Sequence, residues 1–400
     1  MAEAKQLEVP SGFRAAGVKA GIKPSGTLDL AVLVADRNCA AAGTFTTNRI
    51  CAAPVRWDRE LVPSESVRAV VINAGNANAA TGAQGEKNAR RTATRVSELL
   101  GCHPEQVLVA STGVIGHQLP MDRLEAGLAE ALAQASAEAS RFDDASRAIL
   151  TTDSHPKVVS LRRTLGDRSV GLLGLAKGAA MIGPRMATML ACQLTDARVA
   201  ASELQAILSE AVEVSFNCIS VEGHMSTNDT VLLLANGAAG GEPLRGGDLT
   251  EFAAMVREAC VTLARMIPED GEGATHLMII DVEGCRDHEE ARAIARAVAD
   301  SPLVKTAIHG ADPNWGRIVS AAGYAGVPFE ERELSLWLND VPLYQAGAPV
   351  PFDAARVSAH LRARRETLIR LVLTHGSAAI RFWTCDLTAE YVRLNADYTT

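Results

Sequence analysis

An apolar stretch near the middle of the chain runs from Gly171 to Cys192 and reads GLLGLAKGAAMIGPRMATMLAC. It is interrupted by Lys177, Pro184 and Arg185, so it falls short of the roughly eighteen apolar residues that a membrane-spanning helix needs. Its part from Gly178 to Pro184 is a glycine-containing break, whereas Met186 to Leu190 on its own indicates an apolar core strand. We therefore expect a loop followed by a buried strand here.

Short apolar runs and helical segments alternate on both sides of this stretch. The expected strands are 30–34, 67–72, 107–109 and 276–280. The expected helices are 122–140, 250–266, 289–298 and 354–373. This alternation predicts a layered α/β protein whose sites lie on its loops.

The composition excludes several classes of protein. The chain has 400 residues, 48% hydrophobic and 22% charged, which is typical of a globular protein with a sizeable core. A net charge of -8 and only 4% aromatic residues argue against a nucleic-acid-binding surface. The first eight residues lack the basic start and apolar run of a signal peptide. We expect a cytoplasmic protein that binds neither membrane nor nucleic acid.

Several common catalytic and binding motifs are missing from the sequence. The eight cysteines are scattered without a C-x-x-C pair, which favours reduced thiols and argues against a zinc site. There is no P-loop, no G-x-G-x-x-G between a strand and a helix, and no G-x-S-x-G. We therefore expect no metal, no nucleotide cofactor and a less common catalytic apparatus.

Six short segments combine glycine or other small residues with hydrogen-bonding side chains, as loops that approach a ligand do. Each of them alone is more often an ordinary turn. They are Ala74–Asn78, Ser111–Gly116, Lys177–Pro184, Ser226–Asp229, Asp270–Ala274 and Asp312–Arg317.

Taken together, these segments resemble the ornithine acetyltransferase family, the bifunctional glutamate N-acetyltransferases of arginine biosynthesis. The resemblance covers nearly the whole chain, from Gly12-Phe13 to the terminal Thr399-Thr400, and includes Phe45-Thr46-Thr47-Asn48-Arg49. Its most specific part is Met186-Ala187-Thr188-Met189-Leu190, at the family's spacing from Lys177. It implies a layered α/β sandwich of the type shared with N-terminal-nucleophile aminopeptidases.

The resemblance also implies a precursor that cuts itself between Ala187 and Thr188. The products would be an alpha fragment, residues 1–187, and a beta fragment, residues 188–400, which share one core. Cleavage would free the α-amine of Thr188, whose ordinary pKa of roughly 7.7–8.0 leaves part of it neutral near pH 7. Thr188 would then be a nucleophile that carries its own base.

Further site residues are implied by their match to the family. Thr112 and Gly113 match the oxyanion-hole pair, which stabilises the tetrahedral intermediate of acyl transfer. Lys177 suits a substrate carboxylate, and Glu272 suits an ammonium group. The implied substrate-binding positions are Thr152, Lys177, Thr188, Glu272, Asn395 and Thr400.

The implied reaction is a ping-pong transfer. Thr188 takes the acetyl group from N2-acetylornithine and passes it to glutamate, with acetyl-CoA as a second donor in some family members. The family also suggests a heterotetramer of two alpha and two beta fragments. The sequence leaves two alternatives open, an aminopeptidase or amidohydrolase with water as acceptor, and a binding-only paralogue without catalysis. It does not choose between one and two donors, and it gives no indication of feedback by arginine.

A few positions depart from the usual family pattern. Ala180 and Arg185 stand where glycine and asparagine are common, which bears on loop geometry and on the rate of self-cleavage. The usual Asp-Gly-Asp-Thr string is Glu222-Gly223-His224-Met225 here, and His276 and His309 replace a frequent lysine and phenylalanine. We expect His224 and His309 to bear on specificity or pH response.

Overall fold

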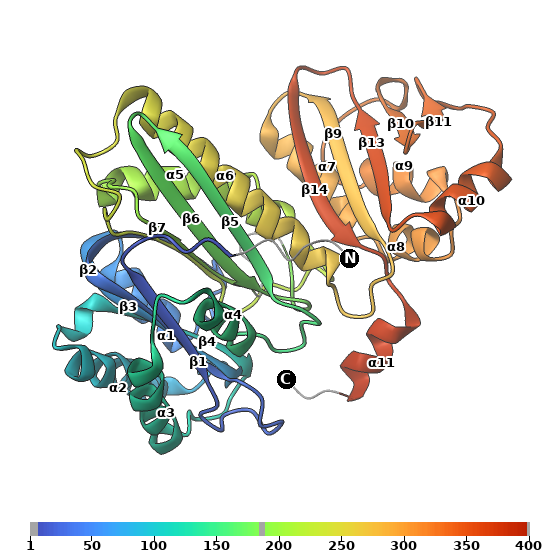
Figure 1. The fold of residues 1–400 in the computed structure, drawn as a ribbon. Helices are drawn as coiled ribbons and strands as arrows, with labels where there is room; N and C mark the ends of the chain where they lie inside the picture. Colours follow the sequence, from blue (N-terminus) through green and yellow to red (C-terminus); the bar gives the residue numbers. More distant parts are fainter. Residues whose placement is uncertain (1–6, 184–188, 398–400) are drawn as a thin grey trace.

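The computed structural model describes residues 7–183 and 189–397. It contains a larger lobe from β1 to α6 and a smaller lobe from β9 to β14, and α11 lies below the smaller lobe, toward the larger one (Figure 1). Strands and helices alternate as the sequence predicts, and each lobe is built on its own sheet. None of the helices in these two described stretches is long and apolar enough to cross a membrane.

The larger lobe contains strands β1 to β8 and helices α1 to α6. Its strands are β1 (Phe13–Val18), β2 (Leu30–Phe45), β3 (Ser64–Asn76), β4 (Val107–Val114), β5 (Lys157–Leu165), β6 (Arg168–Lys177), β7 (Leu190–Thr195) and β8 (Thr230–Ala235). Its helices are α1 (Ala53–Leu61), α2 (Gly82–Leu100), α3 (Met121–Gln134), α4 (Ala139–Ala148), α5 (Ala201–Glu213) and α6 (Gly246–Glu269), with 3-10 turns η1 (Pro104–Gln106) and η2 (Phe216–Cys218).

The long strand β2 turns the first sheet into two layers. The strand order is β4-β3-β2-β8-β7-β6-β5, with β1 also paired to β2. The first half of β2 pairs with β3 and its second half pairs with β8. Residues 36–38 between the halves are exposed, and the register with β3 shifts there. The sheet therefore bends at this point and packs one half against the other.

Side-chain alternation along β2 shows why both faces of each half are apolar. Ala31 and Leu33 point into the core between the two halves, where they meet Leu173 of β6 and Leu232 of β8. The alternate residues of β2 face the opposite way, into a second cluster with α2 and α3. On the outer face of β5–β8 a third cluster holds α5 and α6. The layers are thus helix, sheet, sheet, helix, because a strand buried on both faces needs apolar residues at every position.

The smaller lobe has a second sheet, in the order β12-β11-β10-β13-β9-β14. Its strands are β9 (Leu277–Cys285), β10 (Ser335–Leu338), β11 (Val341–Gln345), β12 (Ala348–Pro349), β13 (Glu366–Val372) and β14 (Ala378–Cys385). Its helices are α7 (His288–Ala299), α8 (Pro302–His309), α9 (Trp315–Gly323) and α10 (Ala354–Ala363), with the turn η3 (Glu331–Glu333), and α11 (Ala389–Asp397) follows.

Two expected helices are wrong in part. The helix expected over 354–373 ends at Ala363, and 366–372 is β13, which pairs in parallel with β9. Burial in β13 alternates strictly, so its apolar residues have a period of two that fits a strand. The helix expected over 122–140 is broken between Gln134 and Ala139. There the backbone of Ser136 pairs with Ala15 of β1 through hydrogen bonds of 3.0 and 3.2 Å.

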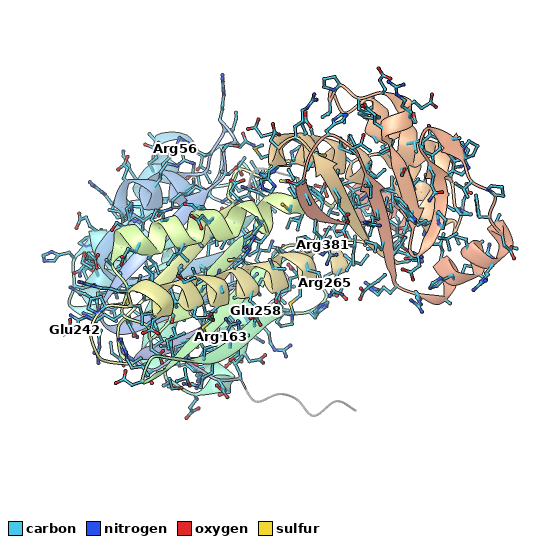
Figure 2. All side chains as sticks on the ribbon, turned by 90° about the horizontal axis from the view of Figure 1, so that it is seen from above. Arg56, Arg163, Glu242, Glu258, Arg265 and Arg381 are labelled. Atoms are coloured by element: carbon cyan, nitrogen blue, oxygen red, sulfur yellow. The ribbon has the colours of Figure 1, made fainter. Side chains whose placement is uncertain are left out.

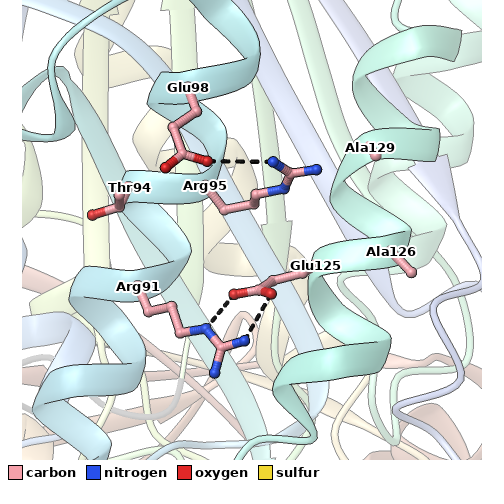
Figure 3. Close-up of a pocket in the computed structure, with 7 residues that line it drawn as sticks. All are labelled: Arg91, Thr94, Arg95, Glu98, Glu125, Ala126 and Ala129. Carbon is pink, nitrogen blue, oxygen red and sulfur yellow. Dashed lines mark hydrogen bonds and ion pairs between the residues drawn. The ribbon is translucent and has the colours of Figure 1, made fainter.

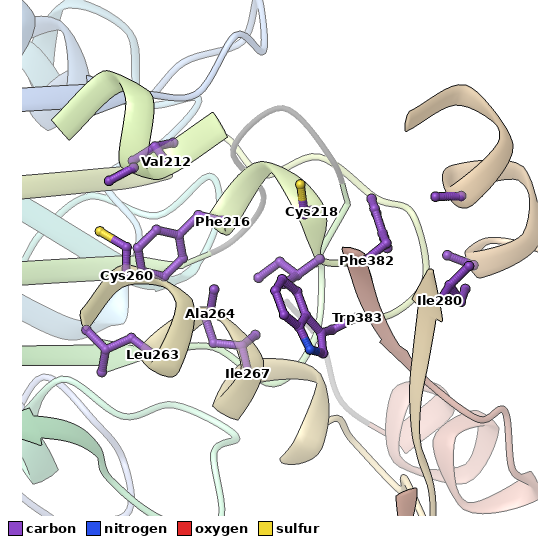
Figure 4. Close-up of a cluster of buried hydrophobic side chains, with 14 of the residues drawn as sticks. Val212, Phe216, Cys218, Cys260, Leu263, Ala264, Ile267, Ile280, Phe382 and Trp383 are labelled. Carbon is purple, nitrogen blue, oxygen red and sulfur yellow. The ribbon is translucent and has the colours of Figure 1, made fainter. Parts of the chain in front are cut away.

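One continuous core joins the lobes. Phe216 and Ile267 of the larger lobe lie in the same apolar cluster as Ile280, Phe382 and Trp383 of the smaller one (Figure 4). The backbone N–H of Ser220 also donates to the carbonyl of Trp383 at 3.0 Å. The lobes therefore cannot separate without exposing apolar surface to water.

The outer surface of α6 carries exposed charges, among them Arg257 and Glu258. Arg163 of β5 pairs with Glu258 of α6, and Arg265 lies further along the same helix (Figure 2). Arg265 pairs with Glu366 at 2.6 Å, which links α6 to β13. Exposed pairs of this kind contribute about 0–1 kcal/mol each, so the core and not the surface holds the lobes together.

Candidate active site

The buried amine of Lys177 connects two strands that are not neighbours in the sheet. Lys177 ends β6, and its side chain is almost fully buried. Its Nζ donates to Oγ1 of Thr112 at 3.2 Å and to Oγ1 of Thr151 at 2.7 Å. Lys177 and Thr112, two of the residues predicted from the sequence, therefore lie in direct contact.

A carboxylate behind Lys177 balances the buried charge. Asp153 lies 4.0 Å from Nζ of Lys177, accepts from Nζ of Lys157 at 2.7 Å, and accepts from the N–H of Gly178 at 2.6 Å. Burial by itself would raise the pKa of Asp153, but Lys177 and Lys157 outweigh it and lower that pKa to about 2. Asp270 accepts from Lys157 at 2.6 Å and extends the network.

The charge network also acts on the lysine itself. Burial lowers the pKa of Lys177, while the charges of Asp153, Asp229 and Glu272 oppose that shift. Thr151, Asp153 and Lys157 are not among the site residues predicted from the sequence. The four-residue spacing of Asp153 and Lys157 was the available signal, but such a pair usually lies on a solvated surface.

The predicted oxyanion pair lies at the end of β4, where the backbone comes very close to β3. Thr112 is buried, and Gly113 has a φ of 126°, in the region that favours glycine. A Cβ on Gly113 would lie 2.3 Å from the carbonyl carbon of Gly75. No side chain fits there, so the two backbones can approach closely only because residue 113 is glycine.

Glu272 and Asn395 form a second predicted pair. Nδ2 of Asn395, on α11, donates to Oε2 of Glu272 at 2.8 Å. The N–H of Glu272 donates to the carbonyl of Ala179 at 2.9 Å, two residues after Lys177. The carboxylate of Glu272 also acts electrostatically on the amine of Lys177, so the site offers a cation and an anion to a zwitterionic ligand.

The other predicted residues are placed less directly or not at all. Thr152 is exposed and lies between Thr151 and Asp153, and it is Thr151 that contacts Lys177. Ala187, Thr188 and Thr400, with Arg185, lie outside the described residues. The structure therefore places Thr112, Gly113, Lys177, Glu272 and Asn395, and leaves the nucleophile itself as a prediction.

The histidines that depart from the family pattern have different surroundings. His224 is exposed. His309 and His276 both approach Oδ2 of Asp386, with Nδ1 at 3.1 and 3.3 Å. His276, directly before β9, and His309, at the end of α8, therefore meet at Asp386, directly after β14, and the effect of the histidines on specificity stays a prediction.

A surface pocket elsewhere does not compete with this site. It lies between α2 and α3 (Figure 3) and contains the pairs Arg91 with Glu125 and Arg95 with Glu98. Its charges are satisfied by each other, and its lining includes none of the predicted site residues. Within residues 7–183 and 189–397 no group of three or more His, Cys, Asp or Glu side chains could hold a metal ion.

Comparison with known proteins identifies the family. The model of the ArgJ family matches residues 14–400. This chain belongs to the ArgJ family. The arginine biosynthesis bifunctional protein ArgJ 1 of a Nostoc species is 45% identical over 405 residues, which cover 98% of each chain. The chain is therefore an ArgJ enzyme of arginine biosynthesis, which confirms the family resemblance.

A solved structure of an ArgJ protein agrees with this assignment. A crystal structure of arginine biosynthesis bifunctional protein ArgJ from Bacillus halodurans is 38% identical and matches with a TM-score of 0.50, covering 51% of this chain and 96% of its own. An ornithine acetyltransferase from Mycobacterium tuberculosis, complexed with ornithine, is 37% identical and covers 46% of this chain and 96% of its own, with a TM-score of 0.40. The predicted α/β fold class is confirmed for this ArgJ chain.

Proposed function

We propose that the chain transfers an acetyl group from N2-acetylornithine to glutamate through an acetyl ester on Thr188. The observation that carries the proposal is the buried contact between Lys177 and Thr112, with Glu272 and Asn395 nearby. It combines a cation for a carboxylate, an anion for an ammonium, and the predicted oxyanion loop. The curated relatives are named bifunctional proteins, which supports acetyl-CoA as a second donor.

Self-cleavage would prepare the nucleophile. The hydroxyl of Thr188 attacks the carbonyl carbon of Ala187, the peptide C–N bond breaks, and water hydrolyses the resulting ester. The products are residues 1–187 and 188–400, the second with a free α-amine. The solved Bacillus halodurans chain matches only about half of this one with nearly its whole length, which supports a cut near the middle.

In the first half-reaction the α-amine of Thr188 accepts the hydroxyl proton while Oγ attacks the acetyl carbon of N2-acetylornithine. Negative charge develops on the carbonyl oxygen, where the loop at Thr112 and Gly113 would stabilise it. The amide C–N bond then breaks, and the ornithine amine leaves with the proton. The product is acetyl-Thr188.

In the second half-reaction the neutral amine of glutamate attacks the ester carbon, and the C–O bond to Thr188 breaks. The proton lost by the new amide returns to Oγ of Thr188. Lys177 would hold the α-carboxylate that donor and acceptor share, and Glu272 would accept hydrogen bonds from the incoming amine. One site can thus serve both half-reactions.

The assembly and location follow from the family resemblance alone. We propose two copies of each fragment in a heterotetramer and a place in the cytoplasm. Both are open to direct measurement of mass and distribution.

The test is an acetyl-transfer assay on the purified protein, with acetylornithine or acetyl-CoA as donor and glutamate as acceptor. We expect two fragments, acetylglutamate as product, and an acetyl-sized mass increase on the fragment 188–400 when acceptor is absent. Thr188→Ala should abolish cleavage and transfer. Thr195→Ala is the matched control at the other end of β7, where the hydroxyl donates to the carbonyl of Gly171 at 2.7 Å and accepts from the N–H of Ala197 at 3.2 Å.

Three results would contradict the proposal. Full transferase activity from an uncut chain would remove the need for a free Thr188 amine. Activity retained in Thr188→Ala would place the nucleophile elsewhere. Free acetate without acetylglutamate would instead establish the hydrolase with water as acceptor.

A further inference from the structure

Asn228 and Asp229 form the turn that leads into β8, and the catalytic steps above do not use them. Both are buried, with 5% and 0% of their surface exposed. They close the segment Ser226–Asp229, one of the six loops that the sequence analysis singled out. Buried polar side chains normally have hydrogen-bond partners, so the partners of these two show what they hold in place.

Asn228 holds the strand that carries the predicted oxyanion loop. Its Nδ2 donates to the carbonyl of Ser111 at 2.8 Å and to the carbonyl of Ala77 at 2.6 Å. The carbonyl of Ser111 and the N–H of Thr112 belong to one planar peptide unit. A bond that fixes the carbonyl therefore fixes the direction in which the N–H of Thr112 points.

Asp229 holds the start of β7, directly after the predicted nucleophile. Its Oδ1 accepts from the backbone N–H of Met189 at 2.9 Å. That nitrogen belongs to the peptide bond between residues 188 and 189.

The surroundings of the dipeptide keep its side chains in place. The N–H of Asn228 donates to Oγ of Ser226 at 3.0 Å, and Oγ1 of Thr227 donates to Oδ1 of Asn228 at 2.5 Å. The N–H of Thr46 donates to the carbonyl of Asp229 at 2.9 Å. Both side chains thus extend from a turn that is itself fixed.

We propose that the dipeptide Asn228–Asp229 is a positioning element that sets Met189, the residue that follows the proposed nucleophile in the sequence, against the oxyanion loop at Thr112 and Gly113. The proposal rests on the proposed function. The sheet ladder does not align these parts, because β4 and β7 are separated by β3, β2 and β8. Consecutive Cα atoms are about 3.8 Å apart, so two adjacent side chains act as a spacer of fixed length.

The experiment compares this dipeptide with a matched pair at the opposite ends of the same strands. Asn228→Ala and the isosteric Asn228→Asp remove the two donated hydrogen bonds, and Asp229→Ala removes the acceptor. Asp229→Asn keeps an oxygen that can accept from Met189. The controls are Asn236→Ala, where Nδ2 donates to the carbonyl of Ser11 at 2.8 Å, and Asp196→Ala, where Asp196 accepts from Gly171 at 2.8 Å.

Each variant is assayed for self-cleavage rate, for kcat and KM of acetyl transfer, and for unfolding in urea, so that rates are compared per folded molecule. A misplacement near 1 Å costs on the order of 100-fold, so we expect kcat to fall by about that factor in Asn228→Ala, Asn228→Asp and Asp229→Ala. KM for glutamate should change little. Asp229→Asn should retain most of kcat, and both controls should keep the wild-type kcat.

Equal kcat in the Asn228 variants and Asn236→Ala would overturn the proposal. So would a loss in Asp229→Asn as large as that in Asp229→Ala, because the acceptor role would then be wrong. Failure of the proposed function is a separate result, seen in the wild type as an absence of acetyl-Thr188. In that case the wild-type control fails before any variant is compared.

Discussion

Single buried residues in this protein depend on charges that the local sequence does not reveal. Lys177 can be buried because Asp153 lies behind it, and Asp153 in turn contacts Lys157. The cost of removing one member of such a network is the unpaired charge that is left behind. The stability of the site is therefore a property of the group and not of Lys177 alone.

Asp153→Asn should destabilise the protein strongly. The change leaves Lys157 and Lys177 buried with one carboxylate fewer, so we expect a loss of about 3–5 kcal/mol in the free energy of unfolding, measured in urea at pH 7. The control is Asp143→Asn, whose exposed partner Arg147 lies at 2.8 Å, with an expected loss of about 1 kcal/mol or less. Equal losses in the two variants would contradict the network.

Glu222 should make stability fall as the pH rises. Its two carboxyl oxygens are buried, and burial raises the pKa of Glu222 to about 8, although the backbone N–H groups of Ile182 and Met181 and the charge of Lys305 lower it. Glu272 and the side chains of Tyr391 and Cys385 also interact with it. The folded state therefore favours the protonated form.

The direction of this pH dependence follows from the difference in the pKa of Glu222 between the folded and unfolded states. In the unfolded chain Glu222 ionises near its ordinary pKa of about 4.3, so stability is fully present below that pH and is lost as the pH rises through about 8. Wild type should lose up to about 1.4 kcal/mol per pH unit relative to Glu222→Gln in urea unfolding between these values. As a control, Glu60→Gln at an exposed position should show the same pH dependence of stability as wild type. If the curves of unfolding free energy against pH are parallel for Glu222→Gln and wild type, Glu222 does not cause the pH dependence.

At the scale of elements, the ends of strands and one peripheral helix build the site. Thr112 lies near the end of β4, Lys177 ends β6, and α11 carries Asn395 to Glu272. None of the described residues of α11 is fully buried. This helix therefore contributes to the site much more than to the core.

Truncation after Thr388 should separate binding from stability. Removal of α11 and the following residues deletes Asn395 and its hydrogen bond to Glu272. Because a hydrogen bond to a charged group contributes about 1.5–3 kcal/mol, KM for glutamate should rise at least about tenfold. The urea midpoint should stay near that of wild type. Asn395→Ala should reproduce the rise in KM, whereas the control Arg393→Ala, on the same helix, should not. If the truncated chain instead unfolds at a lower urea concentration than wild type, α11 has a structural role.

At the scale of the whole molecule, the predicted cut falls inside one sheet. Strands β6 and β7, which flank residues 178–189, are antiparallel neighbours, and β2 pairs with β8 across the same division. The fragments 1–187 and 188–400 thus contribute adjacent strands to a shared core. A covalent break there removes one connection but none of this pairing.

The two fragments should therefore stay together after cleavage. We expect them to co-elute on size exclusion in native buffer, at a mass near a multiple of 42.2 kDa, and to separate only in denaturant. Unfolding followed by far-UV and near-UV signals should give one coincident transition, since the parts share a core. Separate elution of the fragments in native buffer would show that the strand pairing does not hold them.

The sequence by itself determined the fold class and the family, and it predicts the residue types of the site. Short apolar strands between helices predict a layered α/β protein, because backbone periodicity is a local property. The family resemblance carried by the loops at Ser111, Lys177 and Asp270 predicts where the chemistry lies. It predicted Glu366–Val372 wrongly as helix, since the pairing of β13 with β9 is a contact between distant segments.

Only the tertiary structure decided which groups meet. Asp153 reaches Lys177 across 24 residues, Asn228 reaches Ser111 across 117, and Asn395 reaches Glu272 across 123. No spacing rule covers such separations, because they depend on how a bent β2 folds one half of the sheet onto the other. Burial then decides the charge states. From the sequence alone a carboxyl group such as Asp229 is expected to be a solvated anion, whereas in the fold it is buried and accepts a hydrogen bond.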